Sequence, residues 1–260
     1  MTNRAQSVTA ARRLRHQVRS EVLKTRWSLP FLVLLAIVAF TTASSVYGTA
    51  TTHLPKIDSG VLTLAEATHD LVRLSFGSLL FTTVFGVLCF TAELRHRTLA
   101  RTLLQQPGRP TVLAAKAIVC AVTGAIYGAA ALLVATLVTW ATLTANGRDF
   151  RLDREDLLIA VGILLVNVLA GLWGLGIGVL VRSQVSAVSL VLAWTLLIET
   201  MIIGFLPETG RWLPGGAQEA LYRGTDRGTL DMLPGGLLFC GYTCAVLLAA
   251  WAWLRRTEID

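Results

Sequence analysis

Residues 157–181 read LLIAVGILLVNVLAGLWGLGIGVLV and contain no Lys, Arg, Asp, Glu or His. A helix that crosses a hydrocarbon core about 30 Å thick needs roughly 20 predominantly apolar residues. This stretch is long enough, and a charge-free run of this length is typical of a helix that is surrounded by lipid. It therefore predicts a membrane-spanning helix and sets the class of fold.

Five other stretches resemble this one. Four have no charged residue or histidine and the fifth has one charge, Glu199; they are residues 27–47, 74–92, 117–147, 232–254 and 183–206. Only 15% of the 260 residues are charged, whereas soluble domains have about a quarter. A large soluble protein can also contain buried helices that are apolar all round. Six such stretches in one chain make a soluble protein a poor explanation. We expect an all-α membrane protein with six spans, at about residues 27–47, 74–92, 117–140, 157–181, 184–206 and 234–254.

The basic residues predict the orientation of these spans. Fifteen of the 23 Lys and Arg residues lie before the first span, between the second and third, directly after the fourth, and after the sixth. Positively charged loops resist translocation, so we expect these segments and both chain ends in the cytoplasm. The net charge of +7 is therefore a topology signal, and no nucleic-acid partner is expected.

Residues 1–26 are expected to form a cytoplasmic or interfacial domain ahead of a six-helix transmembrane domain over 27–260. Leu14, Val18 and Val22 follow one another at four-residue spacing among many arginines. Such a basic amphipathic helix can lie among anionic lipid headgroups, although a solvated basic tail is the alternative. A cleaved signal peptide has an apolar run of about 7–15 residues, so the longer run after this domain is expected to stay uncleaved.

The outer segments are predicted to be connections. Residues 48–73 and 146–156 are polar, with a short helix possible over 61–71. Residues 207–234 contain Trp-Leu-Pro-Gly-Gly at 212–216, which predicts a turn and a short helix. A re-entrant hairpin is the alternative there, provided that protein covers its backbone.

Small residues recur at helix-packing spacing in two predicted spans. Gly124 and Gly128 lie in the third, and Ala170, Gly174 and Gly178 in the fourth. Small residues let helix backbones approach closely in lipid. The stripes predict close packing, either within the chain or, as the second choice, between two chains.

The sequence lacks the motifs of common catalytic sites. It has no G-x-x-x-x-G-K-[ST] phosphate loop, no H-E-x-x-H zinc helix and no G-x-S-x-G turn. The four cysteines all fall inside predicted spans, with no converging ligand set. We predict no catalytic residue, no metal site and no cofactor bound by this chain.

Glu199 is the only charge inside a predicted span. An ionised carboxylate at that depth is costly unless it finds a partner, water or a proton, so such residues are functional candidates. Glu199 is therefore a substrate-path candidate that could bind a cation or carry a proton. A structural contact with a neighbouring helix is the other interpretation.

The segment between the second and third spans is the largest predicted cytoplasmic loop. Glu93 ends the second span, and residues 94–106 favour a helix with Leu99 and Leu103 on one face. Pro107 and Gly108 end that helix. An amphipathic helix at this place can rest on lipid or on a protein partner.

This segment resembles the type-2 ABC permeases, the membrane subunits of bacterial ATP-driven exporters. That family has E-x-x-x-G-T, then a proline and an arginine, then a lysine entering the third span. The corresponding residues here are Glu93, Arg97-Thr98, Pro107, Arg109 and Lys116. Arg97 stands where the family usually has glycine. The basic helix before the first span, the six spans and the long connection before the sixth extend the resemblance to nearly the whole chain.

The resemblance implies a partner and a mechanism. A separate cytoplasmic ATPase would bind ATP and Mg²⁺, and the helix after the second span would fit into a groove on it. The residues implied in this ATPase coupling are Glu93, Arg95, Arg97, Thr98, Leu99, Arg101, Pro107 and Arg109. Two permease chains, identical or different, would form the pathway in the bacterial cell membrane for a hydrophobic or amphipathic drug, antibiotic, peptide or lipid.

Two other functions remain as alternatives. A secondary transporter would use Glu199 as its proton or cation site and would need no ATPase. A membrane enzyme or a regulatory anchor is the third choice, because no cluster of nucleophiles or metal ligands is evident in the sequence.

Overall fold

The computed structural model describes residues 14–25, 28–95, 109–224 and 229–256. Within these residues the regular structure is entirely helical, so the predicted all-α class is confirmed. Six helical runs are long and apolar enough to cross a membrane, as the charge distribution predicts. These runs begin at Leu29, Leu64, Thr111, Arg154, Gln184 and Met232.

The elements follow one another in a simple order after a first helix over residues 14–25. They are α2 (Leu29–Asp58), α3 (Leu64–Arg73), η1 (Leu74–Gly77), α4 (Ser78–Arg95), α6 (Arg109–Ala145), α7 (Arg154–Val181), α8 (Gln184–Ala193), η2 (Trp194–Glu199), α9 (Thr200–Phe205), α10 (Pro207–Gly210), α11 (Pro214–Leu221) and α12 (Met232–Arg256). The predicted coupling helix after the second span falls on residues 96–108, which lie outside the described residues.

Helix α2 is longer than the sequence predicts, because it continues through residues 48–58 where a connection was expected. A single glycine inside a helix costs only about 1 kcal/mol. Val46 and Ala50 flank Gly48 and are buried in one apolar cluster with Leu71 and Ala135. This burial outweighs the cost of the glycine, so the helix does not end there.

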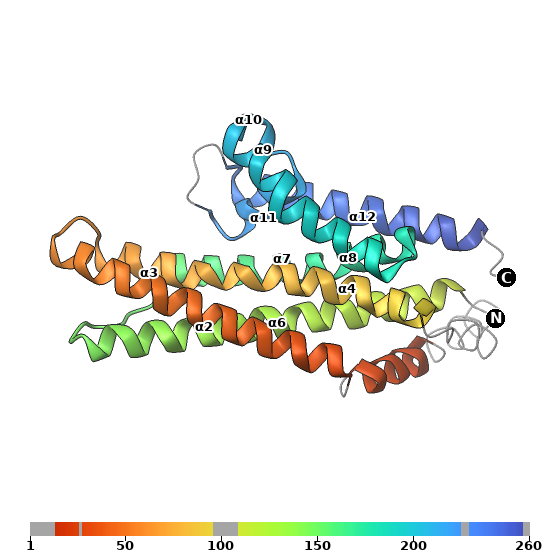
Figure 1. Cartoon of the computed structure of the whole chain (residues 1–260), viewed down its shortest axis with the longest axis horizontal. Helices are drawn as coiled ribbons and strands as arrows, with labels where there is room; N and C mark the ends of the chain where they lie inside the picture. The colour runs from red at the N-terminus through yellow and green to blue at the C-terminus, as the bar shows by residue number, and fades with distance from the viewer. Residues whose placement is uncertain (1–13, 26–27, 96–108, 225–228, 257–260) are drawn as a thin grey trace, which may run out of the picture.

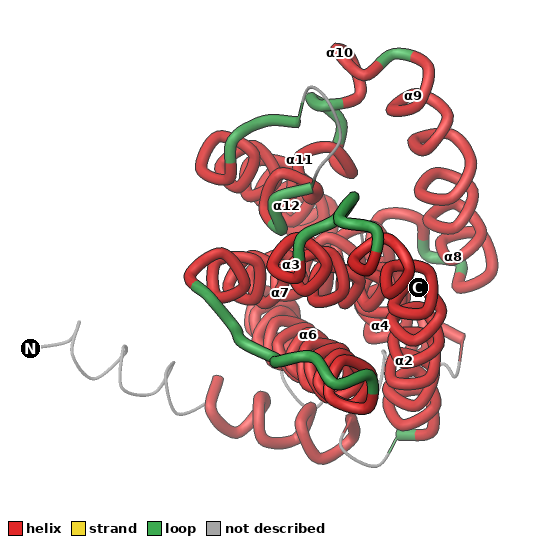
Figure 2. Tube along the Cα trace, turned by 90° about the vertical axis from the view of Figure 1, so that its left-hand side faces the viewer, coloured by secondary structure: helices red, strands yellow, loops and turns green. Residues whose placement is uncertain are grey.

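Helix α7 forms the centre of the bundle and packs against α4, α6 and α12, while α2 packs on α6 (Figures 1 and 2). Its glycines make this possible. A Cβ atom added to Gly174 would overlap the Thr83 carbonyl oxygen on α4, and one added to Gly178 would overlap that of Val87. Gly124 on α6 is equally close to the backbone of Asn167 on α7. The predicted small-residue stripes therefore pack helices within the chain.

The bundle has two distinct ends (Figure 1). The helix over residues 14–25, the start of α6 and the last turn of α12 lie at one end, here called the terminal end. The turns over residues 59–63 and 146–153 lie at the opposite end, here called the loop end.

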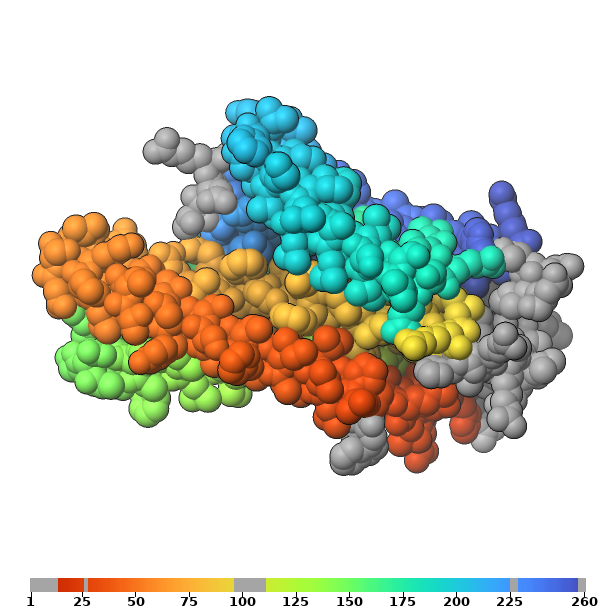
Figure 3. All heavy atoms as spheres, viewed as in Figure 1, coloured from red at the N-terminus to blue at the C-terminus, as the bar shows by residue number. Residues whose placement is uncertain are grey.

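The run α8–η2–α9 leaves the bundle towards the loop end and projects from its side (Figures 1 and 3). Its apolar window is only 11% buried, the lowest share of the six candidate spans. The chain then returns through α11, whose Ala217 and Leu221 are buried against Val166 of α7 and Phe239 of α12. The predicted short helix in this segment is thus confirmed, and protein covers much of it, as a re-entrant position would require.

Candidate functional site

Four charged side chains meet at the terminal end and are here called the charge cluster: Glu21, Lys24, Glu93 and Lys116. The Lys116 ammonium lies 2.8 Å from Glu21 Oε2 and 2.9 Å from Glu93 Oε1. It also donates a hydrogen bond of 3.0 Å to the carbonyl oxygen of Cys89. Lys24 Nζ lies 2.8 Å from the other oxygen of Glu21. The cluster thus joins helix 14–25 to α4 and α6.

Burial makes the charge cluster energetically important. The side chains of Lys116 and Glu21 are only 1% and 3% exposed. Burial alone would raise the pKa of Glu21, but Lys116 and Lys24 lower that pKa below its usual value. Burial alone would likewise lower the pKa of Lys24, but the hydrogen bond to Glu21 and the nearby carboxylates raise it. Both residues of helix 14–25 are therefore held in their charged forms, as the buried ion pair of Glu21 with Lys116 requires.

The cluster places Glu93, the first of the predicted coupling residues, on the inner side of the α4 end, and Arg95 lies exposed at that end. Arg109 begins α6. The other predicted coupling residues lie outside the described residues: Arg97, Thr98, Leu99, Arg101 and Pro107. The resemblance singled out Glu93 and Lys116, but not their contact with each other or with Glu21, which is 95 positions from Lys116.

Glu199 is buried, with 4% of its surface exposed. It ends the π-helical turn η2, and its Oε1 accepts a hydrogen bond from the backbone N–H of Gly215 in the first turn of α11. A Cβ added to Gly215 would overlap the carboxylate. Backbone N–H groups at a helix start lack intrahelical partners and favour negative charge. Glu199 therefore caps α11 and fastens it to the projecting run.

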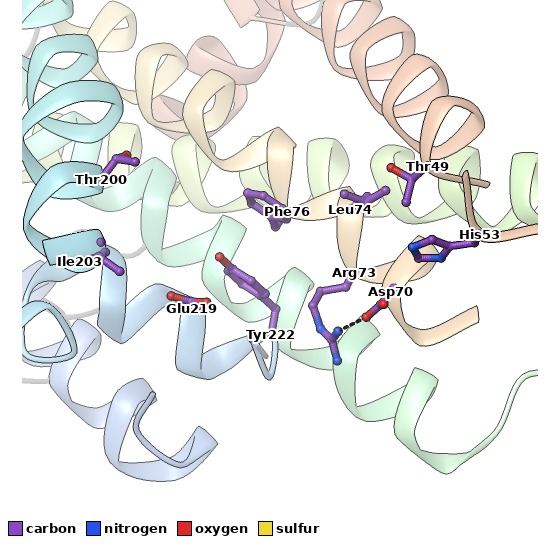
Figure 4. Close-up of a pocket in the computed structure, with 12 residues that line it drawn as sticks. Thr49, His53, Asp70, Arg73, Leu74, Phe76, Thr200, Ile203, Glu219 and Tyr222 are labelled. Atoms are coloured by element: carbon purple, nitrogen blue, oxygen red, sulfur yellow. Dashed lines mark hydrogen bonds and ion pairs between the residues drawn. The ribbon is translucent and has the colours of Figure 1, made fainter. Parts of the chain in front are cut away.

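A cavity of about 580 Å³ lies between the loop-end half of α2, the α3–η1 junction, α9 and α11 (Figure 4). Its volume is within the range typical of small-molecule sites, about 300–1,000 Å³. Its wall combines an Asp70–Arg73 ion pair of 2.7 Å with the stacked rings of Phe76 and Tyr222, whose centroids are 5.2 Å apart. Among the described residues, the lining includes Thr200 and excludes Glu199. A mixed aromatic and charged wall suits an amphipathic ligand.

Asn167 is a buried polar residue that the sequence analysis did not single out. Its Oδ1 accepts hydrogen bonds from the hydroxyls of Ser78 and Thr82, at 3.1 Å and 2.7 Å. Its amide nitrogen donates to the Ile163 carbonyl oxygen at 2.9 Å. Asn167 therefore links α4 to α7 inside the bundle. The sequence analysis followed the charged residues, and asparagine carries no charge.

Comparison of the chain with models of known families and with curated proteins found no match. The six candidate spans and the extensive apolar surface identify a multi-pass membrane protein. A more specific function is inferred from the charge cluster, the cavity and the resemblance of the segment that begins at Glu93.

Proposed function

We propose that the chain is the permease subunit of a bacterial ATP-binding-cassette exporter. In this proposal the terminal end faces the cytoplasm, where a separate ATPase subunit binds ATP and Mg²⁺. The chain forms half of the pathway for a hydrophobic or amphipathic substrate, and it has no catalytic residue of its own. A second permease chain completes the pathway in the cell membrane.

The charge cluster is the observation that supports this proposal most. Glu93 precedes the segment over 96–108 and Lys116 follows it, and their charged groups are 2.9 Å apart. Glu21 also pairs with the Lys116 ammonium, so this ion-pair network includes helix 14–25. A force applied to the segment by an ATPase would therefore act on α4, α6 and helix 14–25 together, because breaking a buried charge pair costs about 3–5 kcal/mol.

The projecting run supports the proposal of a second chain. Leu190, Leu197 and Met201 on this run are at least half exposed. Because large apolar surfaces are covered in the functional state of a protein, lipid and a partner helix are the natural neighbours of this run. Movement of the run would also alter the cavity, since Thr200 and Ile203 form part of its wall.

The permease must have two conformations, and the ATP-bound and ATP-free ATPase must make different contacts with them. A partner that binds both conformations of the permease equally would not shift the equilibrium between them. The proposal assigns these contacts to the segment with Arg95, Arg97 and Arg101. Acidic groups or carbonyl oxygens of the ATPase are the expected partners of these arginines.

Substitution Arg97→Glu tests the proposal. We expect it to lower ATP-driven transport and substrate-stimulated ATP hydrolysis about tenfold or more, because a like-charge contact at an interface costs several kcal/mol. The measurement uses the chain reconstituted in liposomes with the ATPase encoded by a neighbouring gene. The matched control is Arg151→Glu, at the loop end, where the side chain is 86% exposed.

Both variants should reach the membrane in wild-type amounts. Unchanged transport by Arg97→Glu would count against coupling through this segment. Transport that persists without any ATPase, when a proton gradient is imposed, would overturn the permease proposal.

A secondary transporter is the second candidate, because Glu199 is a buried carboxylate inside a candidate span. The permease proposal predicts that Glu199→Gln retains ATP-driven transport within about twofold, since the glutamine carbonyl can still accept the Gly215 N–H. A proton carrier would lose transport, because glutamine cannot be deprotonated. The control is Glu208→Gln, at an 84% exposed side chain. Loss of transport by the Glu199 variant alone would favour the second candidate.

A further inference from the structure

A histidine and two aspartates converge at the loop end, and none of the three belongs to the cavity wall or the charge cluster. His69 lies on α3, Asp153 caps the start of α7, and Asp156 lies in the first turn of α7. His69 Nε2 is 3.0 Å from Asp153 Oδ2 and 3.9 Å from Asp156 Oδ2. One potential ligand atom from each residue lies within 4.8 Å of the other two.

The capping of α7 uses only part of this donor set. Asp153 Oδ1 accepts the backbone N–H groups of Glu155 and Asp156, and its Oδ2 is left to face His69. Asp156 Oδ2 accepts the backbone N–H of Asp153. In the part of the chain that the structure describes, Asp156 Oδ1 has no hydrogen-bond partner, although the side chain is only 3% exposed.

A buried carboxylate oxygen without a partner is unfavourable, so it points to a ligand that would satisfy it. Solvent in bulk cannot do so at a side chain buried this deeply. His69 offers a nitrogen and Asp153 an oxygen within 4.8 Å of a carboxylate oxygen of Asp156. A cation that accepts nitrogen and oxygen ligands fits this arrangement.

We propose that His69, Asp153 and Asp156 bind a divalent transition-metal ion, with Zn²⁺ as the best fit. Zinc binds histidine nitrogen and carboxylate oxygen at about 2.0–2.2 Å, so two tetrahedral ligands lie about 3.4 Å apart. His69 Nε2 lies 3.0 Å from Asp153 Oδ2 and 3.9 Å from Asp156 Oδ2, on either side of that value. Asp156 Oδ2 also caps α7, and the unpartnered Oδ1 is the second oxygen of the same carboxylate. Mg²⁺ and Ca²⁺ fit less well, because they prefer sites made of oxygen alone.

The fourth position of the ion would hold water. Asp153 is 52% exposed, so the site opens to solvent on that side. The ion would link α3 to the start of α7 and would also complete the coordination of Asp156. This site is independent of the proposed transport function, because its residues belong neither to the charge cluster nor to the cavity wall.

Zinc titration of the full chain tests the proposal. The chain is purified in detergent with an affinity tag that contains no histidine, treated with a chelator, and titrated with Zn²⁺ by calorimetry. We expect one ion per chain and a rise in melting temperature on binding. Co²⁺ in place of Zn²⁺ should give visible absorption bands from a nitrogen and oxygen ligand set.

His69→Gln and Asp156→Asn should each weaken Zn²⁺ binding by about tenfold to hundredfold or more, since even second-shell partners of metal ligands contribute that much. Asp153→Asn should also weaken binding while asparagine preserves the helix cap. The matched controls are His53→Gln and Asp149→Asn, which change the same residue types outside the site and should leave affinity unchanged.

Each contrary result is decisive. No binding of Zn²⁺ by the wild-type chain would show that the three residues form only an ion pair between α3 and α7. Equal binding by wild type, His69→Gln and Asp156→Asn would place the ion elsewhere. The melting temperatures of the metal-free variants separate these outcomes from misfolding.

Discussion

Replacement of Lys116 by methionine is expected to lower the free energy of unfolding by about 3–5 kcal/mol. The substitution preserves the length of the side chain but removes the ammonium that binds Glu21 and Glu93. Glu21 would then remain buried, and the half-exposed Lys24 would be its one remaining ion-pair partner among the described residues. The measurement is reversible unfolding in mixed micelles of detergent and dodecyl sulfate.

Two further variants identify the cause of the loss. Lys24→Met should cost only about 1 kcal/mol or less, because that side chain is 48% exposed and exposed ion pairs contribute little. Combining Lys116→Met with Glu21→Gln should restore part of the stability, as expected for residues that interact directly. A Lys116→Met chain as stable as wild type would rule out the importance assigned to the charge cluster.

Replacement of Gly174 by leucine is expected to lower the free energy of unfolding by about 3 kcal/mol, at the upper end of typical overpacking costs. The new Cβ would overlap the backbone carbonyl of Thr83, which cannot turn away as a side chain can. Helices α4 and α7 would have to separate, and this would weaken the Asn167 hydrogen bonds to Ser78 and Thr82. The same unfolding assay measures the loss.

Gly241→Leu is the matched control for this substitution. Gly241 lies on the exposed face of α12, and a Cβ added there meets no atom of the described residues within 4 Å. Leucine also has a better helix propensity than glycine, by about 0.5–1 kcal/mol. The control should therefore be as stable as wild type or slightly more so. Similar losses in both variants would contradict close packing at Gly174 as the cause.

The sequence predicted the all-α class and the number of candidate spans because six long apolar stretches are separated by charges. It predicted their ends less well, because helix ends depend on local capping and on tertiary burial. Thr63 and Glu66 form a capping box that begins α3, and this pattern is visible in the sequence. The continuation of α2 to Asp58 depends instead on its contacts with α3 and α6.

The candidate site was predictable only in part. The resemblance singled out Glu93 and Lys116, but their contact needs α4 and α6 to be placed side by side. Glu199 was identified as a buried charge, whereas its partner Gly215 became evident only when α11 was placed beside it. The cavity and the group of His69, Asp153 and Asp156 each combine residues from separate elements. No local sequence pattern therefore predicts either of them.

The charge cluster also affects the order in which parts of the chain can fold during synthesis. As the chain leaves the ribosome, Glu21 and Lys24 emerge first, Glu93 later and Lys116 last. Before Lys116 arrives, the two carboxylates share a single lysine, which is not enough to hold them both in a dry environment. The amino-terminal helix can therefore complete its buried ion pairs only after Lys116 and the start of α6 are in place.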